Sequence, residues 1–280
     1  MPEPRRAGLR WLSPLGFLDL AWWEWGPAEG RPVLCVHGLT RNGRDFDVLA
    51  AALAAQGRRV LCVDLPGRGG SARLANPALY QPLTYVQALS HLLARLDGPV
   101  DWVGTSLGGI CGMAVAATPG NAVGRLVLND VGGFIPKAAI ARIRDYVGTD
   151  PEFADLAGVA AYLRQVHAGF GALSEAQWQE MARHSAVALP GGGFRMSYDP
   201  AIAVPMRAVE AADVDMWVYW QAVTAPTLVL RGAESDLLLP ETAERMAQKP
   251  GVRLEVVAGC GHAPALLEPA QVALVTSFLG

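Results

Sequence analysis

The segment Val100-Asp101-Trp102-Val103-Gly104-Thr105-Ser106-Leu107-Gly108 contains the most informative motif of this sequence. The short apolar run at 100–104 is typical of a strand buried on both faces of a parallel sheet. Residues 107–117 are apolar all round and predict a buried helix. Between them, a Gly-x-Ser-x-Gly turn would expose the hydroxyl of Ser106 at the helix N-terminus, where developing negative charge is stabilised. This strand–turn–helix context favours a nucleophilic serine over a serine that only caps the helix.

The alternation of strands and helices continues on both sides of this motif. A hairpin is predicted for residues 8–25, and short apolar runs separated by helical patterns follow it. The predicted strands are 31–36, 59–64, 100–104, 125–130, 226–231 and 252–257, and the predicted helices are about 46–57, 82–96, 107–117, 241–248 and 268–279. This order predicts a doubly wound, mostly parallel α/β sheet.

Segment 82–96 is the clearest amphipathic helix of the chain. We expect its polar residues, including His91, to face water. We expect it to bury one apolar stripe, which consists of Leu83, Val86, Leu89, Leu93 and Leu96.

The alternating pattern is interrupted between residues 134 and 223, where only helical stripes are found. Because sheet strands are predicted on both sides, this block is interpreted as a helical cap inserted into one α/β core, which comprises 1–133 and 224–280. Methionine and tryptophan are frequent in the block, and they could either pack it onto the sheet or form an adaptable apolar roof over the serine. The candidate pocket residues there are Met206, Trp217 and Trp220.

The composition excludes several classes of function. The chain has 280 residues, of which 51% are hydrophobic and 18% are charged, so a large folded core is expected. The formal net charge of −3 argues against nucleic-acid binding and against a polybasic membrane anchor. The sequence has no uninterrupted run of about 18 apolar residues and no signal-peptide pattern. We therefore expect a cytoplasmic protein that acts on a small-molecule substrate and has no membrane partner.

The cysteines and glycines do not form a cofactor motif. The four cysteines include no Cys-x-x-Cys pair, and no cluster of His, Cys and Asp has the spacing of a zinc site. The glycine runs at 67–70 and 191–193 lack the Gly-x-Gly-x-x-Gly context of a dinucleotide site. We expect neither a metal nor a cofactor.

A nucleophilic serine needs a general base, and His262 is the preferred candidate among the five histidines. It lies in Gly259-Cys260-Gly261-His262-Ala263-Pro264, after the last predicted strand, and catalytic groups gather at the carboxyl ends of strands in open α/β sheets. His167 and His184 lie in the insertion without a turn motif. His37 ends the first core strand, and we expect it to bond loop backbone and to border the substrate pocket.

The base in turn needs a carboxylate that orients it. Asp236 is preferred because it follows a predicted strand and gives the chain order Ser106, Asp236, His262, which one class of catalytic triads uses. Two alternatives are open. Glu234 lies in the same loop, and Asp130 ends the strand that follows the serine-bearing helix.

Two backbone N–H groups are needed to bind an oxyanion. One is expected from Leu107, the residue after the nucleophile. The other is expected from Leu39 in the loop after the first core strand, where Gly38 lets the backbone approach the substrate closely. Arg41 follows in the same loop and is a further candidate for the substrate pocket.

Five segments, taken together and in order, resemble the α/β-hydrolase superfamily over nearly the full length of the chain. They are His37-Gly38, Asp64-Leu65-Pro66-Gly67-Arg68-Gly69-Gly70-Ser71, Gly104-Thr105-Ser106-Leu107-Gly108-Gly109, Gly232-Ala233-Glu234-Ser235-Asp236 and Gly261-His262. The resemblance implies a mostly parallel eight-stranded sheet with a helical cap after the sixth strand. It also implies that Asp64 and Arg68 are structural turn residues.

Within that superfamily, the chain looks most like the branch of small carboxylesterases, lactonases, cofactor-free perhydrolases and C–C bond hydrolases. Ser106 occupies the position at which haloalkane dehalogenases and epoxide hydrolases of this fold carry aspartate. This difference argues against both of those chemistries.

We interpret the protein as a serine hydrolase that cleaves small to medium apolar esters through an acyl-enzyme. Ser106 would attack the carbonyl carbon, His262 would take its proton and Asp236 would hold the imidazole. One alternative is C–C cleavage of a ring-cleavage diketone, with Arg41 or Asn42 binding the substrate carboxylate. Lactonase or perhydrolase activity is another. A hydrolase-fold binding protein without turnover is a further alternative, against which a complete triad argues.

Overall fold

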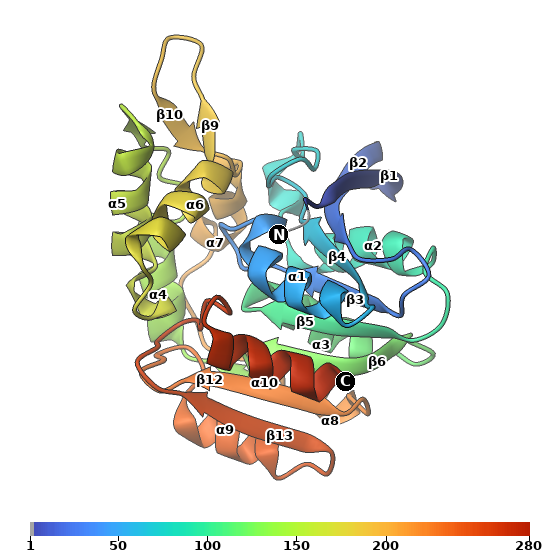
Figure 1. Ribbon diagram of the computed structural model, residues 1–280. Helices are drawn as coiled ribbons and strands as arrows, with labels where there is room; N and C mark the ends of the chain where they lie inside the picture. Colours follow the sequence, from blue (N-terminus) through green and yellow to red (C-terminus); the bar gives the residue numbers. More distant parts are fainter. Residues whose placement is uncertain (1–2) are drawn as a thin grey trace.

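An eight-stranded sheet forms the centre of the protein in the computed structural model, which describes residues 3–280 (Figure 1). In chain order its strands are β1 (Arg5–Ser13), β2 (Gly16–Trp25), β3 (Pro32–Val36), β4 (Arg59–Asp64), β5 (Val100–Thr105), β6 (Val123–Asn129), β12 (Thr227–Gly232) and β13 (Val252–Val257). Across the sheet their order is β1-β2-β4-β3-β5-β6-β12-β13. β2 pairs antiparallel with β1 and β4, and the other neighbours pair in parallel. The predicted fold class is confirmed.

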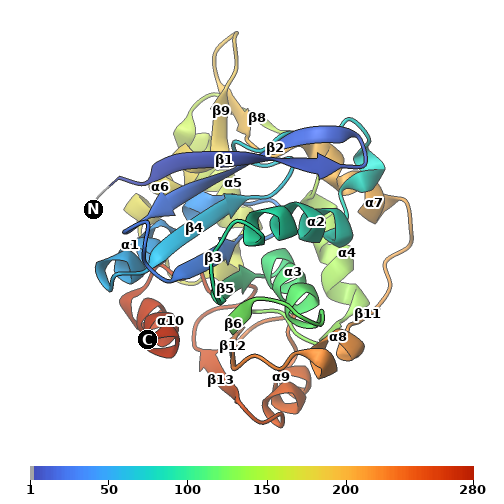
Figure 2. The ribbon, with the colours of Figure 1, turned by 90° about the vertical axis from the view of Figure 1, so that its right-hand side faces the viewer.

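Helices cover both faces of the sheet (Figure 2), and its central strands are therefore buried on both sides. In β3, Leu34 and Val36 enter one hydrophobic cluster, while Val33 and Cys35 enter another. The first cluster includes residues of α2, α3 and α9, and the second includes residues of α1 and α10. These helices are α1 (Asp47–Ala55), α2 (Pro82–Leu93), α3 (Leu107–Ala116), α9 (Pro240–Ala247) and α10 (Pro269–Leu279).

Helix α2 buries a different face from the one that its leucine spacing predicts. Leu83 is 78% exposed, so the expected stripe is wrong at its first position, although Leu89 is fully buried. Tyr85 and Leu92 lie in the core instead. Tyrosine can be buried here because Arg68 Nη1 donates a hydrogen bond of 2.8 Å to its hydroxyl.

The chain leaves the sheet after β6 and returns at β12, so the insertion follows the sixth strand as the resemblance implies. Figure 1 shows its main helices as a layer on one side of the sheet. The insertion also contains short strands that the sequence did not predict, arranged as the sheets β8-β10-β9 and β11-β7. Its elements are β7 (Phe134–Ile135), α4 (Lys137–Tyr146), β8 (Glu152–Phe153), α5 (Leu156–Val166), α6 (Glu175–Ser185), β9 (Ala186–Ala188), β10 (Phe194–Met196), α7 (Val204–Arg207), β11 (Val214–Asp215) and α8 (Trp217–Ala222).

Helix α8 does not lie with the other helices of the insertion. Figures 1 and 2 show it beside α9, and it also packs on α3. The Nζ of Lys249, which follows α9, donates hydrogen bonds of 2.8 and 2.9 Å to the carbonyl oxygens of Trp220 and Gln221. Strand β11, which directly precedes α8, pairs with β7. This pairing holds the two ends of the insertion side by side.

The two leucines of α2 provide a matched test of which face is buried. We expect Leu89→Ala to lower the free energy of unfolding by about 2–5 kcal/mol, because it leaves a cavity in the core. Leu83→Ala should change it by less than about 0.5 kcal/mol, because that side chain is exposed. Urea unfolding of both variants measures the difference, and equal losses would contradict the observed orientation of the helix.

Candidate active site

Ser106 occupies a sharp turn between β5 and α3, which are the strand and helix that the sequence predicts around it. Its φ of 51° and ψ of −114° lie in a backbone region that residues with a side chain rarely adopt. A Cβ at Gly108 would overlap the carbonyl of Val36, and a Cβ at Gly104 would overlap the backbone of Gly108. The Gly-x-Ser-x-Gly pattern is therefore required by the close passage of backbone around Ser106.

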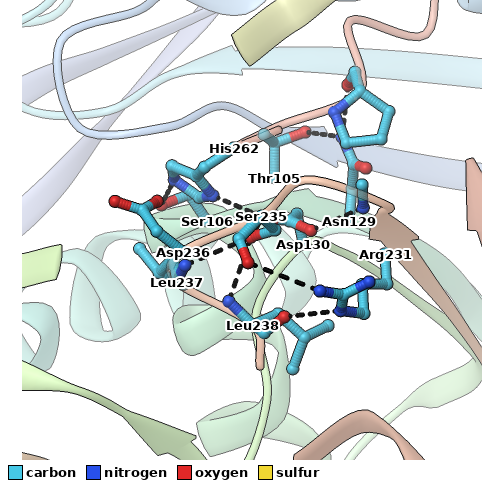
Figure 3. A network of polar contacts seen from close by, with 12 residues as sticks. Thr105, Ser106, Asn129, Asp130, Arg231, Ser235, Asp236, Leu237, Leu238 and His262 are labelled. Atoms are coloured by element: carbon cyan, nitrogen blue, oxygen red, sulfur yellow. Dashed lines mark hydrogen bonds and ion pairs between the residues drawn. The ribbon is translucent and has the colours of Figure 1, made fainter. Parts of the chain in front are cut away.

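His262 lies between Ser106 and Asp130 (Figure 3). Its Nε2 is 3.0 Å from Oγ of Ser106, and its Nδ1 is 2.7 Å from Oδ2 of Asp130. The imidazole is 11% exposed and the carboxylate is fully buried. The structure thus brings together the predicted nucleophile, the predicted base and one of the two alternative acids.

Asn129 joins the strand beside the serine to the loop that carries the histidine. Its Nδ2 donates to Oγ1 of Thr105 at 3.0 Å and to the carbonyl of Pro264 at 2.8 Å. From the insertion, the carbonyl of Gly169 accepts a hydrogen bond of 2.8 Å from the amide of Gly261. These contacts hold the histidine loop against both the sheet and the insertion.

Asp236 does not contact His262, so the preferred acid of the sequence analysis is corrected. Its carboxylate forms a bidentate ion pair with Arg142 of α4, at 2.5 Å to Nε and 2.8 Å to Nη2, and it is 49% exposed. Glu234 is exposed as well. The physical reason is the course of the loop after β12, which turns Ser235 inward and leaves both acidic neighbours on the outside.

Ser235 is a member of the site that the sequence analysis missed. Its Oγ accepts hydrogen bonds from the amides of Leu237 at 3.2 Å and Leu238 at 3.1 Å. Because these two donors occupy its lone pairs, its own proton is directed to Oδ2 of Asp130, 2.5 Å away. The amide of Gly232 donates to Oδ1 of the same carboxylate at 2.8 Å. The only sequence signal for Ser235 was its place in a loop, where a serine hydroxyl often bonds the backbone amides that follow it. Such serines are common, so this signal could not single it out.

The predicted oxyanion donors are the amides of Leu39, in the loop after β3, and of Leu107, the first residue of α3. Across residues 3–280, neither amide donates a hydrogen bond to another backbone group. A Cβ built at Gly38 would lie 3.7 Å from Cβ of Ser106, so the first loop passes close to the serine. Arg68 Nε fixes that loop by donating to the carbonyl of Leu39 at 2.9 Å. The predicted role in binding an oxyanion requires amides that have no backbone acceptor, and both of these meet that requirement.

His37 lies inside this loop and does not line a pocket, which corrects one part of its predicted role. Its side chain is fully buried, its Nε2 accepts from the amide of Leu65 at 3.0 Å, and its Nδ1 donates to the carbonyl of Gly38 at 2.6 Å. Burial, and then the positive charge of Arg68, lower the pKa of His37 to about 3. The ring is therefore a neutral brace for the loop, as its expected backbone bonds imply.

The predicted pocket residues of the insertion lie in two separate helices, α7 and α8, which pack against different parts of the core. Trp217 and Trp220 line a surface hollow of about 350 Å³ beside α9, where Arg245 lies 3.8 Å above the Trp217 ring. Met206 lies in α7, which packs against the 77–79 turn. Arg41, in contrast, is buried in the loop next to the serine.

A hydroxyl, an imidazole and a buried carboxylate in hydrogen-bonded series can perform nucleophilic catalysis. His262 can take the proton of Ser106, and Asp130 can fix the tautomer and stabilise the imidazolium that forms. Within the described part of the chain, no group of three or more His, Cys, Asp and Glu side chains is arranged to hold a metal ion. None of the helices between residues 3 and 280 is both long and apolar enough to cross a membrane.

Comparisons with known proteins identify the family and the fold. The sequence matches the profile of the alpha/beta hydrolase family over residues 33–274. It is 41% identical to a 3-hydroxybutyrate-oligomer hydrolase of Cupriavidus necator, across 99% of this chain and 98% of that protein. Among solved structures, an alpha/beta hydrolase from Novosphingobium aromaticivorans is 38% identical with a TM-score of 0.89, covering 100% of this chain and 99% of the other. A putative hydrolase from Rickettsia typhi is 30% identical with a TM-score of 0.91, covering 99% of both chains.

The neutral state of His37 predicts an acid-sensitive contribution to stability. Below pH 6.5 the unfolded chain protonates this histidine while the folded protein does not, so stability is lost as the pH falls from 6.5 toward 3. Between pH 7 and pH 5 we expect the wild type to lose about 2 kcal/mol more than His37→Asn, which cannot be protonated there. Urea unfolding at both pH values measures this difference. Parallel losses in the two proteins would show that His37 is not held neutral.

Proposed function

The chain belongs to the alpha/beta hydrolase family and is a hydrolase, and we propose that it cleaves esters of short hydroxy acids through a Ser106–His262–Asp130 triad. The hydrogen-bonded series of these three side chains is the observation that carries the proposal. The relative from Cupriavidus necator is named for hydrolysis of 3-hydroxybutyrate oligomers. This name supports such oligomers as the first substrates to test.

In the proposed reaction, Ser106 Oγ attacks the ester carbonyl while His262 Nε2 accepts its proton. The amides of Leu39 and Leu107 bind the oxyanion that develops on the carbonyl oxygen. His262 then returns the proton to the leaving alcohol, and an acyl group remains on the serine. Water attacks this acyl-enzyme, again with His262 as the base, and releases the acid.

We also propose that the insertion acts as a cap over this site. Two contacts support this role. The carbonyl of Gly169 accepts from Gly261 beside His262, and the carbonyl of His184 accepts a 2.9 Å hydrogen bond from Nδ2 of Asn42 in the oxyanion loop. The insertion thus touches the loops on both sides of Ser106. The boundaries of 134 and 223 for this cap stay a prediction, because α8 lies apart with α9.

The proposed function is tested with a panel that contains p-nitrophenyl butyrate, the 3-hydroxybutyrate dimer and a ring-cleavage diketone. We expect hydrolysis of both esters, and we expect Ser106→Ala to lower kcat by several orders of magnitude while circular dichroism shows an intact fold. Retention of a tenth of the activity in this variant would remove the serine from the mechanism. Turnover of the diketone alone would favour C–C cleavage.

A pair of aspartate variants tests the assignment of the acid. We expect Asp130→Asn to lower kcat by roughly 10³–10⁴-fold, because the amide cannot hold the required tautomer of His262. Asp236→Asn removes a carboxylate from the adjacent loop but breaks only an exposed ion pair with Arg142, so its effect on kcat should be small. Steady-state kinetics on p-nitrophenyl butyrate measure both. The reverse ranking would return the role of the acid to Asp236.

A further inference from the structure

The ion pair of the buried Arg41 side chain leaves one of its hydrogen-bond donors without a partner. The side chain is 4% exposed, and its Nε and Nη2 donate to the carboxylate of Asp45 at 2.9 and 2.6 Å. Its Nη1 is buried and has no hydrogen-bond partner within residues 3–280. An unsatisfied buried donor destabilises the fold, and more so on a charged group. A ligand that accepts a hydrogen bond from Nη1 would remove this cost.

This arginine stands beside the nucleophile. Its backbone amide donates to the carbonyl of Gly38 at 3.2 Å, in the same loop that supplies Leu39. A methyl group built at Gly38 would lie 3.7 Å from Cβ of Ser106 and 4.0 Å from Cγ of Arg41. The stem of the Arg41 side chain therefore starts at the wall of the site that holds the serine.

The insertion contributes a second polar group, His167, to the same region. Its ring is buried, lies stacked on Phe170 with 4.6 Å between centroids, and meets Tyr146 edge-on at 6.2 Å. The ring makes no hydrogen bond to the side chains or backbone that the structure describes. Two residues later, Gly169 packs against the backbone of His262.

Charge also links His167 to Arg41. Burial, followed by the positive charge of Arg41, lowers the pKa of His167 well below its ordinary value, so the ring is neutral. Arg142 is the other arginine whose charge acts on this ring, and its guanidinium is bound by both carboxylate oxygens of Asp236. Of these two arginines, Arg41 is the one with a buried donor that lacks a partner within residues 3–280.

We infer that Arg41, together with His167, forms a subsite for the free carboxylate on the alcohol half of the substrate. The inference rests on the proposed function. In a 3-hydroxybutyrate dimer, the carboxylate carbon is four bonds from the attacked carbonyl carbon, so a subsite for it must lie close to Ser106, as the loop that carries Arg41 does. Guanidinium is the side chain best matched to a carboxylate, and a neutral imidazole can add one N–H donor. The site then selects the acid end of an oligomer.

The test compares the 3-hydroxybutyrate dimer with its methyl ester, in which a neutral ester replaces the free carboxylate of the alcohol half. We expect the wild type to have the higher kcat/KM for the free acid. Arg41→Gln should lower the ratio of the two kcat/KM values at least tenfold, since a hydrogen bond to a charged group is lost. His167→Gln should lower it less. Arg41→Lys, which keeps the charge but not the fork, should fall between wild type and Arg41→Gln.

Arg44→Gln is the matched control. Arg44 lies three residues along the same segment and pairs with Asp47 at 2.6 Å, while its guanidinium stands over the Trp23 ring at 4.7 Å. Its replacement removes the same charge from the same segment, and we expect the ratio to stay at the wild-type value. Equal falls for Arg41→Gln and Arg44→Gln would show a general effect of charge and would overturn the inference.

A second measurement does not depend on turnover of the dimer. Inhibition of p-nitrophenyl acetate hydrolysis by 3-hydroxybutyrate is compared with inhibition by its methyl ester. We expect the acid to inhibit the wild type more strongly, and we expect this preference to be weakened most by Arg41→Gln and less by Arg41→Lys. Equal inhibition by both compounds in the wild type would overturn the subsite. Failure of the dimer and its methyl ester to react, with p-nitrophenyl acetate still cleaved, would instead refute the proposed substrate.

Discussion

The buried carboxylate of Asp130 is the constraint on which the arrangement of the site depends. A charge in a fully buried position is stable only when hydrogen bonds satisfy it. Its three donors come from two segments: the amide of Gly232 and the hydroxyl of Ser235 belong to the end of β12 and the loop after it, and Nδ1 belongs to His262. This requirement brings the ends of β6 and β12 and the histidine loop together at one edge of the sheet. The position of the acid thereby sets where the base meets Ser106.

Much of the fold follows from patterns that are local in sequence. Continuous apolar runs predict the central strands because each of these strands is buried on both faces. The orientation of α2 is not local, because it depends on how Tyr85 and Leu92 pack against neighbouring elements. The short strands β8 to β10 are likewise set by tertiary pairing, since two or three residues carry no periodic signal.

The site shows the same division. Ser106 and His262 stand in compact glycine-rich motifs that can be recognised from the order of residues alone. The acid cannot be chosen in this way, because Asp130 and Asp236 both follow strands and only the path of the loop after β12 separates them. The sequence likewise shows that Trp217 belongs to the insertion but does not show which way its side chain points. In the structure its ring contacts Arg245 at the surface. Local motifs therefore identify the serine and the histidine, whereas the acid that orients the histidine depends on which segments meet in space.

The pairing of β7 with β11 has a consequence for the evolution of this chain. Phe134 and Ile135 lie opposite Asp215 and Val214, so the long excursion begins and ends at one point of the scaffold. The entropic cost of closing such a loop, expressed as a free energy, grows only with the logarithm of its length, at about 0.6 kcal/mol for each doubling. The stability of the core therefore depends only weakly on the length of the polypeptide between β7 and β11. Whole helices can be gained, lost or exchanged between these strands, and substrate range can diverge while the chemistry is inherited intact.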